Sequence, residues 1–186
     1  LQETCKFLEQ DIEQSVNESA SDKRTEIVYA RTEGWPMGVK LCRLAFHSAS
    51  HQNLLDDIDG SNVYIKEYFI GQILSSVPSD LVLFLTKLSL FEKFNRSLLS
   101  HIFEEDHPQE RFAELLRRNL FIYRCEDASD WYYIHPLLAD VLRYRLLSLP
   151  KEDVRRICAL ASEWFYNNNY SNEAVKHLII SGDIAY

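Results

Sequence analysis

His135 is the first candidate in this chain for a side chain that does chemistry. It follows an aromatic stretch, residues 131–134, and precedes Pro136. An imidazole at such a place can donate a hydrogen bond to an anion such as a phosphate, or it can bond a backbone carbonyl at the edge of a core. The sequence groups no nucleophile, base and orienting residue together. No catalytic site is therefore predicted, and this chain is not expected to be an enzyme by itself.

The sequence also lacks the common patterns that bind metals and phosphates. Only 5 of 186 residues are Gly, and neither GxGxxG nor GxxxxGK[ST] occurs, so no phosphate-binding loop is predicted. The four cysteines are widely spaced, without a CxxC pair, which favours reduced thiols over zinc ligands: Cys5, Cys42, Cys125 and Cys158. The acidic run at 104–106 lacks the spacing of a calcium loop. No metal site is predicted.

Composition and charge exclude further classes of protein. With 20 Lys and Arg against 28 Asp and Glu, the net charge is −8, which argues against a broadly basic nucleic-acid-binding surface. The hydrophobic share of 46% indicates a folded chain. No apolar run approaches the roughly 18 residues of a membrane span, and no signal peptide is visible, so a cytoplasmic location is expected. The chain starts at Leu1 without an initiator Met, and we expect it to be part of a longer protein.

The elements that would position His135 begin with a helical segment at 1–60. Gly34 suits the residue that follows a helix, and Pro36 suits the first turn of the next one. Residues 50–61 are polar and acidic, as expected of a boundary between domains.

Residues 61–149 combine helices with one β-hairpin. Pro78, Asn95 and Pro108 each mark the start of a helix. Residues 120–123 and 131–134 are aromatic and β-branched, and the polar loop between them makes a hairpin. Short helices followed by a hairpin are the arrangement of a winged helix.

Residues 150–186 have two apolar helical faces separated by a short turn near 167–171. A long helix with an antiparallel partner is typical of one tetratricopeptide-like repeat, which cannot cover its apolar face alone. The fold class predicted for the whole chain is thus mostly α: a helical segment, a winged helix with one β-hairpin, and a C-terminal antiparallel helix pair.

Three blocks of sequence resemble one family in the same order along the chain. Residues 31–41, RTEGWPMGVKL, are similar to TEGWxxGLxL. Residues 115–122 and 131–142 are similar to LExxNLFL and WYRYHPLFADLL. Residues 161–183 are similar to AxxWxxxxGxxxEAIxHALxAGD. The chain thereby resembles the large LuxR-family ATP-dependent regulators of the maltose-regulon-activator type, a branch of the signal-transduction ATPases with numerous domains.

The resemblance implies a layout and a set of partners. Residues 1–60 would be the helical lid of an ATPase module, 61–149 the winged helix, and 150–186 the start of a superhelical sensor domain that receives an inducer. A P-loop ATPase core would lie upstream in the same chain and would bind ATP or ADP. A LuxR-type helix-turn-helix would lie downstream and bind DNA, and the activated protein would self-associate.

The resemblance also implies roles for three residues. Gly34-Trp35-Pro36 resembles the GLP element of related switch ATPases, whose proline packs near adenine, so Trp35 and Pro36 become nucleotide-binding candidates. His135 resembles the histidine of their MHD element, which reaches the β-phosphate of ADP and keeps the inactive state closed. The sequence departs from those elements twice. The family often has Ala at the position of Pro36, and Pro136 replaces the Asp of the MHD element.

Other interpretations stay open beside these. Helix capping alone explains Pro36, and a carbonyl bond in a core explains His135. The winged helix would bind DNA directly if Arg117 and Arg118 formed a basic face, although Glu110 and Glu114 share their helix. A third alternative is a protein-interaction module built on the terminal repeat. The aromatic residues 131–133 are either a platform for ligand stacking or strand residues divided between core and surface.

Overall fold

A computed structural model describes residues 26–48, 62–104, 107–126 and 130–182. The chain divides into two compact units, and helix and strand residues show that the predicted, mostly helical fold class is correct. Described residues up to Ser76 and residues 135–141 form the first unit, and residues 77–134 and 142–182 form the second. The predicted boundary at residues 50–61 lies outside the described residues. None of the described helices combines the length and apolar character needed to cross a bilayer.

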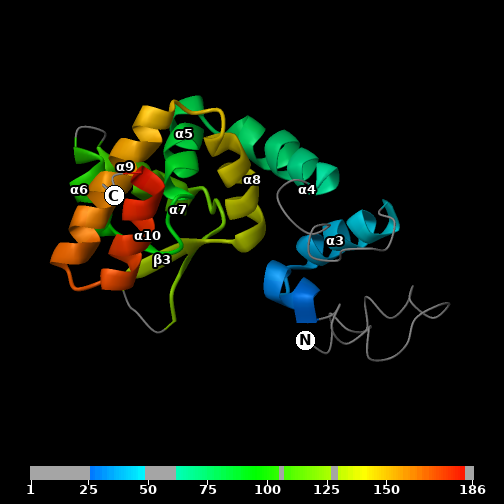
Figure 1. The fold of residues 1–186 in the computed structure, drawn as a ribbon. Coiled ribbons are helices and arrows are strands. Elements are labelled where there is room, and N and C mark those ends of the chain that lie inside the picture. The colour runs from blue at the N-terminus through cyan, green and yellow to red at the C-terminus, as the bar shows by residue number, and fades with distance from the viewer. Residues whose placement is uncertain (1–25, 49–61, 105–106, 127–129, 183–186) are drawn as a thin grey trace. The chain divides into compact units, whose positions relative to one another are not determined.

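The first unit is helical. Residues 26–32 form a helix, and α3 (Pro36–Ser48) follows it. A continuous helical stretch then runs through α4 (Val63–Glu67), the π-helical η1 (Tyr68–Ile73) and the 3-10 turn η2 (Leu74–Ser76). Figure 1 shows these elements in blue to green. Asn62 caps α4, because its side-chain oxygen accepts a hydrogen bond from the Tyr64 amide at 3.0 Å.

The junction before α3 has the geometry that its sequence predicts. The helix over residues 26–32 ends where Glu33 and Gly34 adopt left-handed φ angles of 49° and 76°. The Trp35 amide then donates to the Thr32 carbonyl at 2.8 Å, and Pro36 opens α3. The chain therefore turns sharply, and Trp35 lies inside the turn.

Gly38 gives the first testable prediction. A Cβ there would lie 2.7 Å from Trp35 Cε3 and 3.2 Å from Thr32 Cβ, so Gly38→Ala forces the indole to move. We expect a loss of about 1–2 kcal/mol in the free energy of unfolding, despite the better helix propensity of Ala. Gly71→Ala is the matched control, because its Cβ would meet nothing within 4 Å, and it should stabilise by about 0.5–1 kcal/mol. Urea denaturation of both variants checks this, and equal effects would contradict it.

The second unit is built on a small sheet and the helices that pack on it. In chain order its elements are α5 (Ser79–Leu88), β1 (Phe94–Asn95), α6 (Arg96–Ile102), α7 (Pro108–Arg117), β2 (Ile122–Arg124) and β3 (Trp131–Ile134). The sheet order is β1-β3-β2, both pairs are antiparallel, and Tyr123 pairs with Tyr133. The predicted hairpin is therefore confirmed, with β1 as an additional strand.

Buried phenylalanines dominate the core of this unit. Phe84, Phe94 and Phe112 are almost fully buried, and the Phe112 ring meets Phe94 edge-on at 5.8 Å. Asn95 caps α6, since its side-chain oxygen accepts from the Leu98 amide at 2.8 Å. The cap fixes where α6 begins beside β1.

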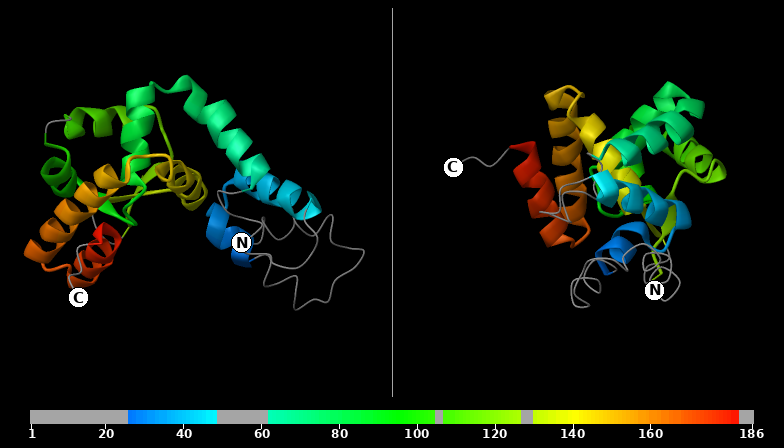
Figure 2. Two further views of the ribbon diagram at one scale, coloured as in Figure 1. Left: turned by 45° about the horizontal axis from the view of Figure 1, so that its top comes forward. Right: turned by 90° about the vertical axis from the view of Figure 1, so that its right-hand side faces the viewer.

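The last three helices are α8 (Pro136–Leu146), α9 (Lys151–Asn167) and α10 (Ser171–Ser181). Figures 1 and 2 show α9 and α10 side by side, and the Ser162 hydroxyl donates to the Ala174 carbonyl at 2.9 Å. Gly182 ends α10 with φ of 76°. Val175, Ile179 and Ile180 on α10 are exposed, so part of the apolar face of this pair is uncovered.

Candidate functional site

His135 lies where β3 ends and α8 begins, and only 1% of its surface is exposed. Its carbonyl accepts the first hydrogen bond of the helix from the Ala139 amide, at 2.9 Å, which makes His135 the N-cap residue of α8. Its ring atom Nδ1 accepts a hydrogen bond from the Leu137 amide at 3.3 Å. The imidazole thus satisfies an amide that the first helical turn leaves without a backbone partner.

The other ring nitrogen bonds a different helix of the same unit. His135 Nε2 lies 3.0 Å from the carbonyl oxygen of Thr32. Only the neutral tautomer with its proton on Nε2 satisfies both contacts, since Nδ1 must accept and Nε2 must donate. Burial lowers the pKa of His135, while the Thr32 carbonyl and the charge of Glu33 act in the opposite direction. His135 is therefore a neutral hydrogen-bond donor at neutral pH.

Trp35 packs beside that imidazole. The two ring centroids are 5.8 Å apart, and the rings meet edge-on at 71°. The same indole contacts Tyr68 at 5.6 Å and Phe69 at 5.8 Å. Pro36 follows as an exposed residue at the start of α3. The structure thus brings together Trp35 and His135, which lie 100 positions apart in the sequence, and places Pro36 next to Trp35 in the chain.

An ion pair that the sequence did not predict supports this arrangement. Arg31 Nη1 lies 3.0 Å from Asp140 Oδ2, and both side chains are partly buried. Arg31 lies in the block 31–41 and Asp140 in the block 131–142, both of which resemble the family, but opposite charges 109 positions apart give no local signal. The pair joins the helix over residues 26–32 to α8. Arg31 precedes Thr32 directly, and Asp140 lies five residues after His135, so the ion pair is close in the sequence to both partners of the His135–Thr32 hydrogen bond.

The described residues do not form the other sites considered in the sequence. No group of three or more His, Cys, Asp or Glu among them could hold a metal ion. Cys42, Cys125 and Cys158 are free and buried. Burial raises the pKa of Cys42 to about 12 and that of Cys158 to about 11, so both remain thiols at neutral pH. Cys5 lies outside the described residues.

Comparison with known proteins identifies the segment around the hairpin. Residues 70–154 match the family model of the MalT winged helix domain. This segment is a MalT-type winged helix domain. The predicted resemblance is thereby confirmed, and the winged helix carries His135 at the end of its hairpin.

The chain as a whole is similar to longer regulators. It is 30% identical over 155 residues to the HTH-type transcriptional regulator MalT of Yersinia enterocolitica, which covers 82% of this chain and 17% of that protein. It is 28% identical over 190 residues to the protein of the same name from Cronobacter sakazakii, covering 98% of this chain and 20% of the relative. The MalT of Yersinia pestis is 29% identical over 155 residues, with 82% and 17% covered. The chain spans about a fifth or less of the length of these relatives.

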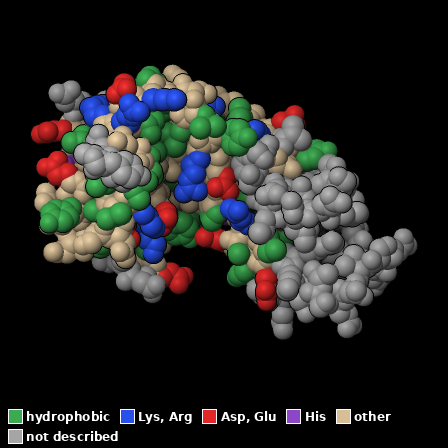
Figure 3. Space-filling model, in the orientation of Figure 1, with side chains coloured by type: hydrophobic (Ala, Val, Ile, Leu, Met, Phe, Trp, Pro, Cys, Tyr) green, Lys and Arg blue, Asp and Glu red, His purple; other side chains and the backbone are tan. Residues whose placement is uncertain are grey.

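The MalT-type winged helix has a mixed charge on its described surface. Arg117 and Arg118, at the end of α7, both pair with Glu114. Figure 3 shows Lys and Arg side chains interspersed with Asp and Glu on the visible face. Glu114 therefore offsets part of the positive charge of the two arginines that a direct DNA-binding face would use.

The aromatic residues of β3 have three different surroundings. Tyr132 packs edge-on against Phe112 at 4.9 Å, and Tyr133 lies 5.8 Å from Tyr123 on β2. Trp131 lines a cavity in the second unit. All three are half-buried, so the strand does not divide them between core and surface. The sequence left this choice open, and the structure places Trp131 at the wall of that cavity.

Proposed function

We propose that this chain is a regulatory part of a cytoplasmic, ATP-dependent transcriptional regulator of the LuxR type. In this proposal the helical lid and the winged helix help to hold ADP against an ATPase core in the inactive state. The MalT-type winged helix and the similarity to regulators named MalT support the assignment. Residues 1–60, 61–149 and 150–186 would be lid, winged helix and start of the sensor domain.

The packing of Trp35 against His135 is the observation that carries this proposal. Two segments that resemble nucleotide-contacting elements lie together in one compact unit, at the first turn of α8. The N-terminus of a helix favours negative charge, because its unpaired amide groups point outward and the positive end of the helix dipole lies there. A neutral imidazole donor at that place suits a phosphate oxygen, and an indole with Pro36 beside it suits the flat face of adenine.

The hydrogen bonds of His135 suggest how the switch works. Its Nε2 proton is already donated to the Thr32 carbonyl, so contact with a phosphate requires exchange of one acceptor for the other. Because the Trp35 amide also donates to Thr32, that carbonyl keeps one partner after the exchange. The ring thus has two alternative acceptors that can be selected by bound nucleotide.

The rest of the cycle belongs to other parts of the longer protein. An upstream P-loop core would bind the nucleotide, and the repeat domain would receive an inducer. Inducer and ATP together would favour an open, self-associating form, and a downstream helix-turn-helix would bind DNA. This chain would couple those events by releasing the lid.

His135→Ala in the full-length protein tests the proposal through ADP affinity, measured by calorimetry. We expect at least a tenfold loss, equivalent to about 1.4 kcal/mol. Because Ala also removes the helix cap, His135→Asn serves as a second variant that keeps a capping oxygen while losing the imidazole donor, and it should lose affinity as well. Arg155→Ala, on the exposed face of α9, is the control. Unchanged affinity in both His135 variants would leave His135 as a structural cap, and no ADP binding by wild type would remove the proposal.

A further inference from the structure

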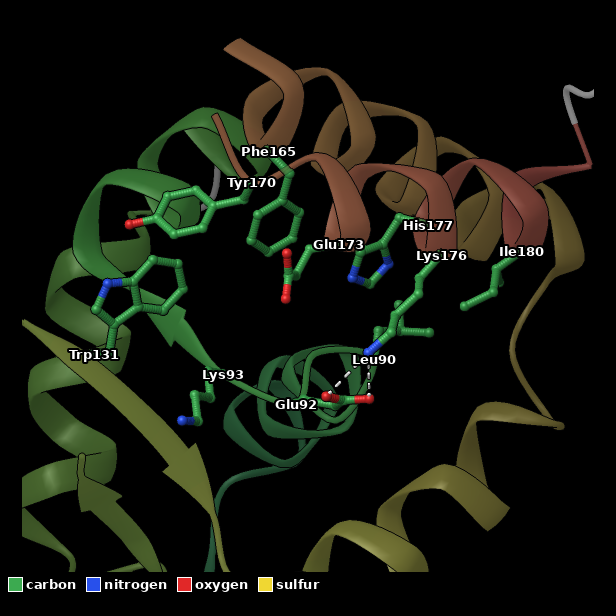
Figure 4. A pocket seen from close by; sticks show the side chains of 10 residues that line it. All are labelled: Leu90, Glu92, Lys93, Trp131, Phe165, Tyr170, Glu173, Lys176, His177 and Ile180. Carbon is green, nitrogen blue, oxygen red and sulfur yellow. Dashed lines mark hydrogen bonds and ion pairs between the residues drawn. The ribbon is translucent and has the colours of Figure 1, made fainter. Parts of the chain in front are cut away.

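The second unit contains a cavity of about 450 Å³ that the nucleotide proposal does not use. One wall is formed by α9, α10 and the turn between them, and the other by the segment before β1 together with β3 (Figure 4). The volume falls in the ordinary range of small-molecule sites. Its lining combines aromatic rings, two pairs of opposite charges and one buried histidine.

Three aromatic side chains form a rigid apolar wall. The Trp131 ring meets the Tyr170 ring edge-on at 5.2 Å, and it lies nearly parallel to the Phe165 ring at 6.4 Å. Figure 4 shows the three rings on one side of the cavity. Such rings offer a large flat contact area at little cost in conformational entropy, so a planar ligand can stack there.

His177 supplies a polar atom for which the described part of the chain offers no hydrogen-bond partner. It lies on α10, is 6% exposed, and stacks on Phe165 at 5.3 Å and 6°. Its Nδ1 is buried and has no hydrogen-bond partner among the described residues. An unsatisfied buried polar atom costs about 1–3 kcal/mol, so its retention at a cavity wall needs a reason. A ligand in the cavity can supply that partner if the ring turns about its Cβ–Cγ bond, because Nδ1 is buried in the structure as it stands.

The charged residues at the cavity are balanced but incompletely paired. Lys176 Nζ lies 3.1 and 3.3 Å from the two carboxylate oxygens of Glu92. Lys93 and Glu173 line the same cavity, and neither forms an ion pair with another described residue. Opposite charges held apart at one cavity match a ligand that carries both a carboxylate and an ammonium group.

We propose that this cavity binds a small zwitterion with a flat apolar ring, of the class of the aromatic amino acids. The ring stacks among Trp131, Phe165 and Tyr170, the carboxylate faces Lys93, and the ammonium group faces Glu173. His177 hydrogen-bonds a polar group of the ligand. The inference deepens the sensing half of the proposed function, because α9 and α10 begin the domain to which we assign the inducer, and it is independent of the His135 contact.

Calorimetry on the 186-residue chain tests the ligand class with four related probes. L-Tryptophan carries both charges, tryptamine only the positive one, indole-3-propionate only the negative one, and indole neither. We expect tryptophan to bind at least tenfold more tightly than each of the other three. Equal binding of indole and tryptophan would overturn the zwitterion, and no binding of any probe would overturn the site.

Three variants test the residues. Lys93→Gln and Glu173→Gln should each weaken tryptophan at least tenfold, and Lys93→Gln should leave tryptamine unchanged. His177→Phe keeps the stacked ring and removes the nitrogens, so it should retain or raise the melting temperature while weakening tryptophan tenfold. Lys151→Gln and Glu163→Gln, exposed on α9 and outside the cavity lining, are matched controls.

Tryptophan binding that none of the three cavity variants weakens would place the ligand elsewhere and overturn the proposal. Failure of the tryptophan test would leave the ADP measurement on His135 unaffected, because His135 belongs to the other compact unit. The two proposals can therefore fail separately.

Discussion

Phe112→Ala is expected to lower the free energy of unfolding of this chain by about 3–5 kcal/mol. The Phe112 ring is fully buried on α7, with Tyr132 of β3 at 4.9 Å, Phe94 of β1 at 5.8 Å and the Arg96 guanidinium 5.1 Å above its face. Truncation removes ring contacts to the edge strand β1 and to the central strand β3 at once. The resulting cavity cannot close without moving the sheet.

Urea denaturation of the chain measures the free energy of unfolding, and two further variants set the scale for the Phe112→Ala effect. Phe112→Leu keeps most of the buried volume and should cost about 1–1.5 kcal/mol. Tyr166→Ala, at a side chain 72% exposed on α9, should stay within about 0.5 kcal/mol of wild type. A Phe112→Ala cost close to that of Tyr166→Ala would show that α7 does not anchor the sheet.

The local elements of this fold could be predicted because each has a local cause. Asn95 at the start of α6 and Gly182 at the end of α10 act through their own side chain or backbone freedom. The two aromatic stretches of the hairpin pair across one polar loop, so their pairing needs no distant information. These local preferences predict the folded structure correctly because the tertiary contacts favour the same conformations.

Strand β1 could not be predicted in this way. It has only two residues, Phe94 and Asn95, and two residues show no alternation. Among the described strands its only partner is β3, where it pairs with Tyr132 and Trp131 along the edge that β2 leaves open. A strand this short exists only through its partner.

The candidate site shows the same limit over a longer distance. The resemblance pointed to Trp35 and His135 separately, but their contact depends on the turn at Gly34 and on the N-cap of α8. The bond from His135 Nε2 to the Thr32 carbonyl could not be predicted, because every residue carries a carbonyl and the sequence does not mark one. The cavity around His177 was missed for a similar reason, since three separate segments line it.

His135→Ala is the second change with a large expected effect on stability. It removes the cap from the Leu137 amide, the donor to the Thr32 carbonyl and the ring packed on Trp35. We expect the free energy of unfolding to fall by about 2–4 kcal/mol at neutral pH. His135→Asn, which keeps a capping oxygen, should recover about 1 kcal/mol of that loss. Urea denaturation at neutral pH separates the two variants, and equal costs would mean that the Nδ1 cap contributes nothing.

The pH dependence of these variants tests the protonation state of the ring. Burial lowers the pKa of folded His135 below its ordinary value of 6.5, so the unfolded chain takes up the proton first as pH falls. Wild type should therefore be most stable above about pH 6.5 and lose stability below it, and His135→Asn should lose less over the same interval. Because burial lowers the pKa of His177 too, part of the slope should persist in His135→Asn and disappear when His177→Phe is added. If His135→Asn leaves the slope of unfolding free energy against pH unchanged, the fold does not hold His135 neutral. The proposed exchange of the Thr32 carbonyl for a phosphate oxygen would then lose its physical basis.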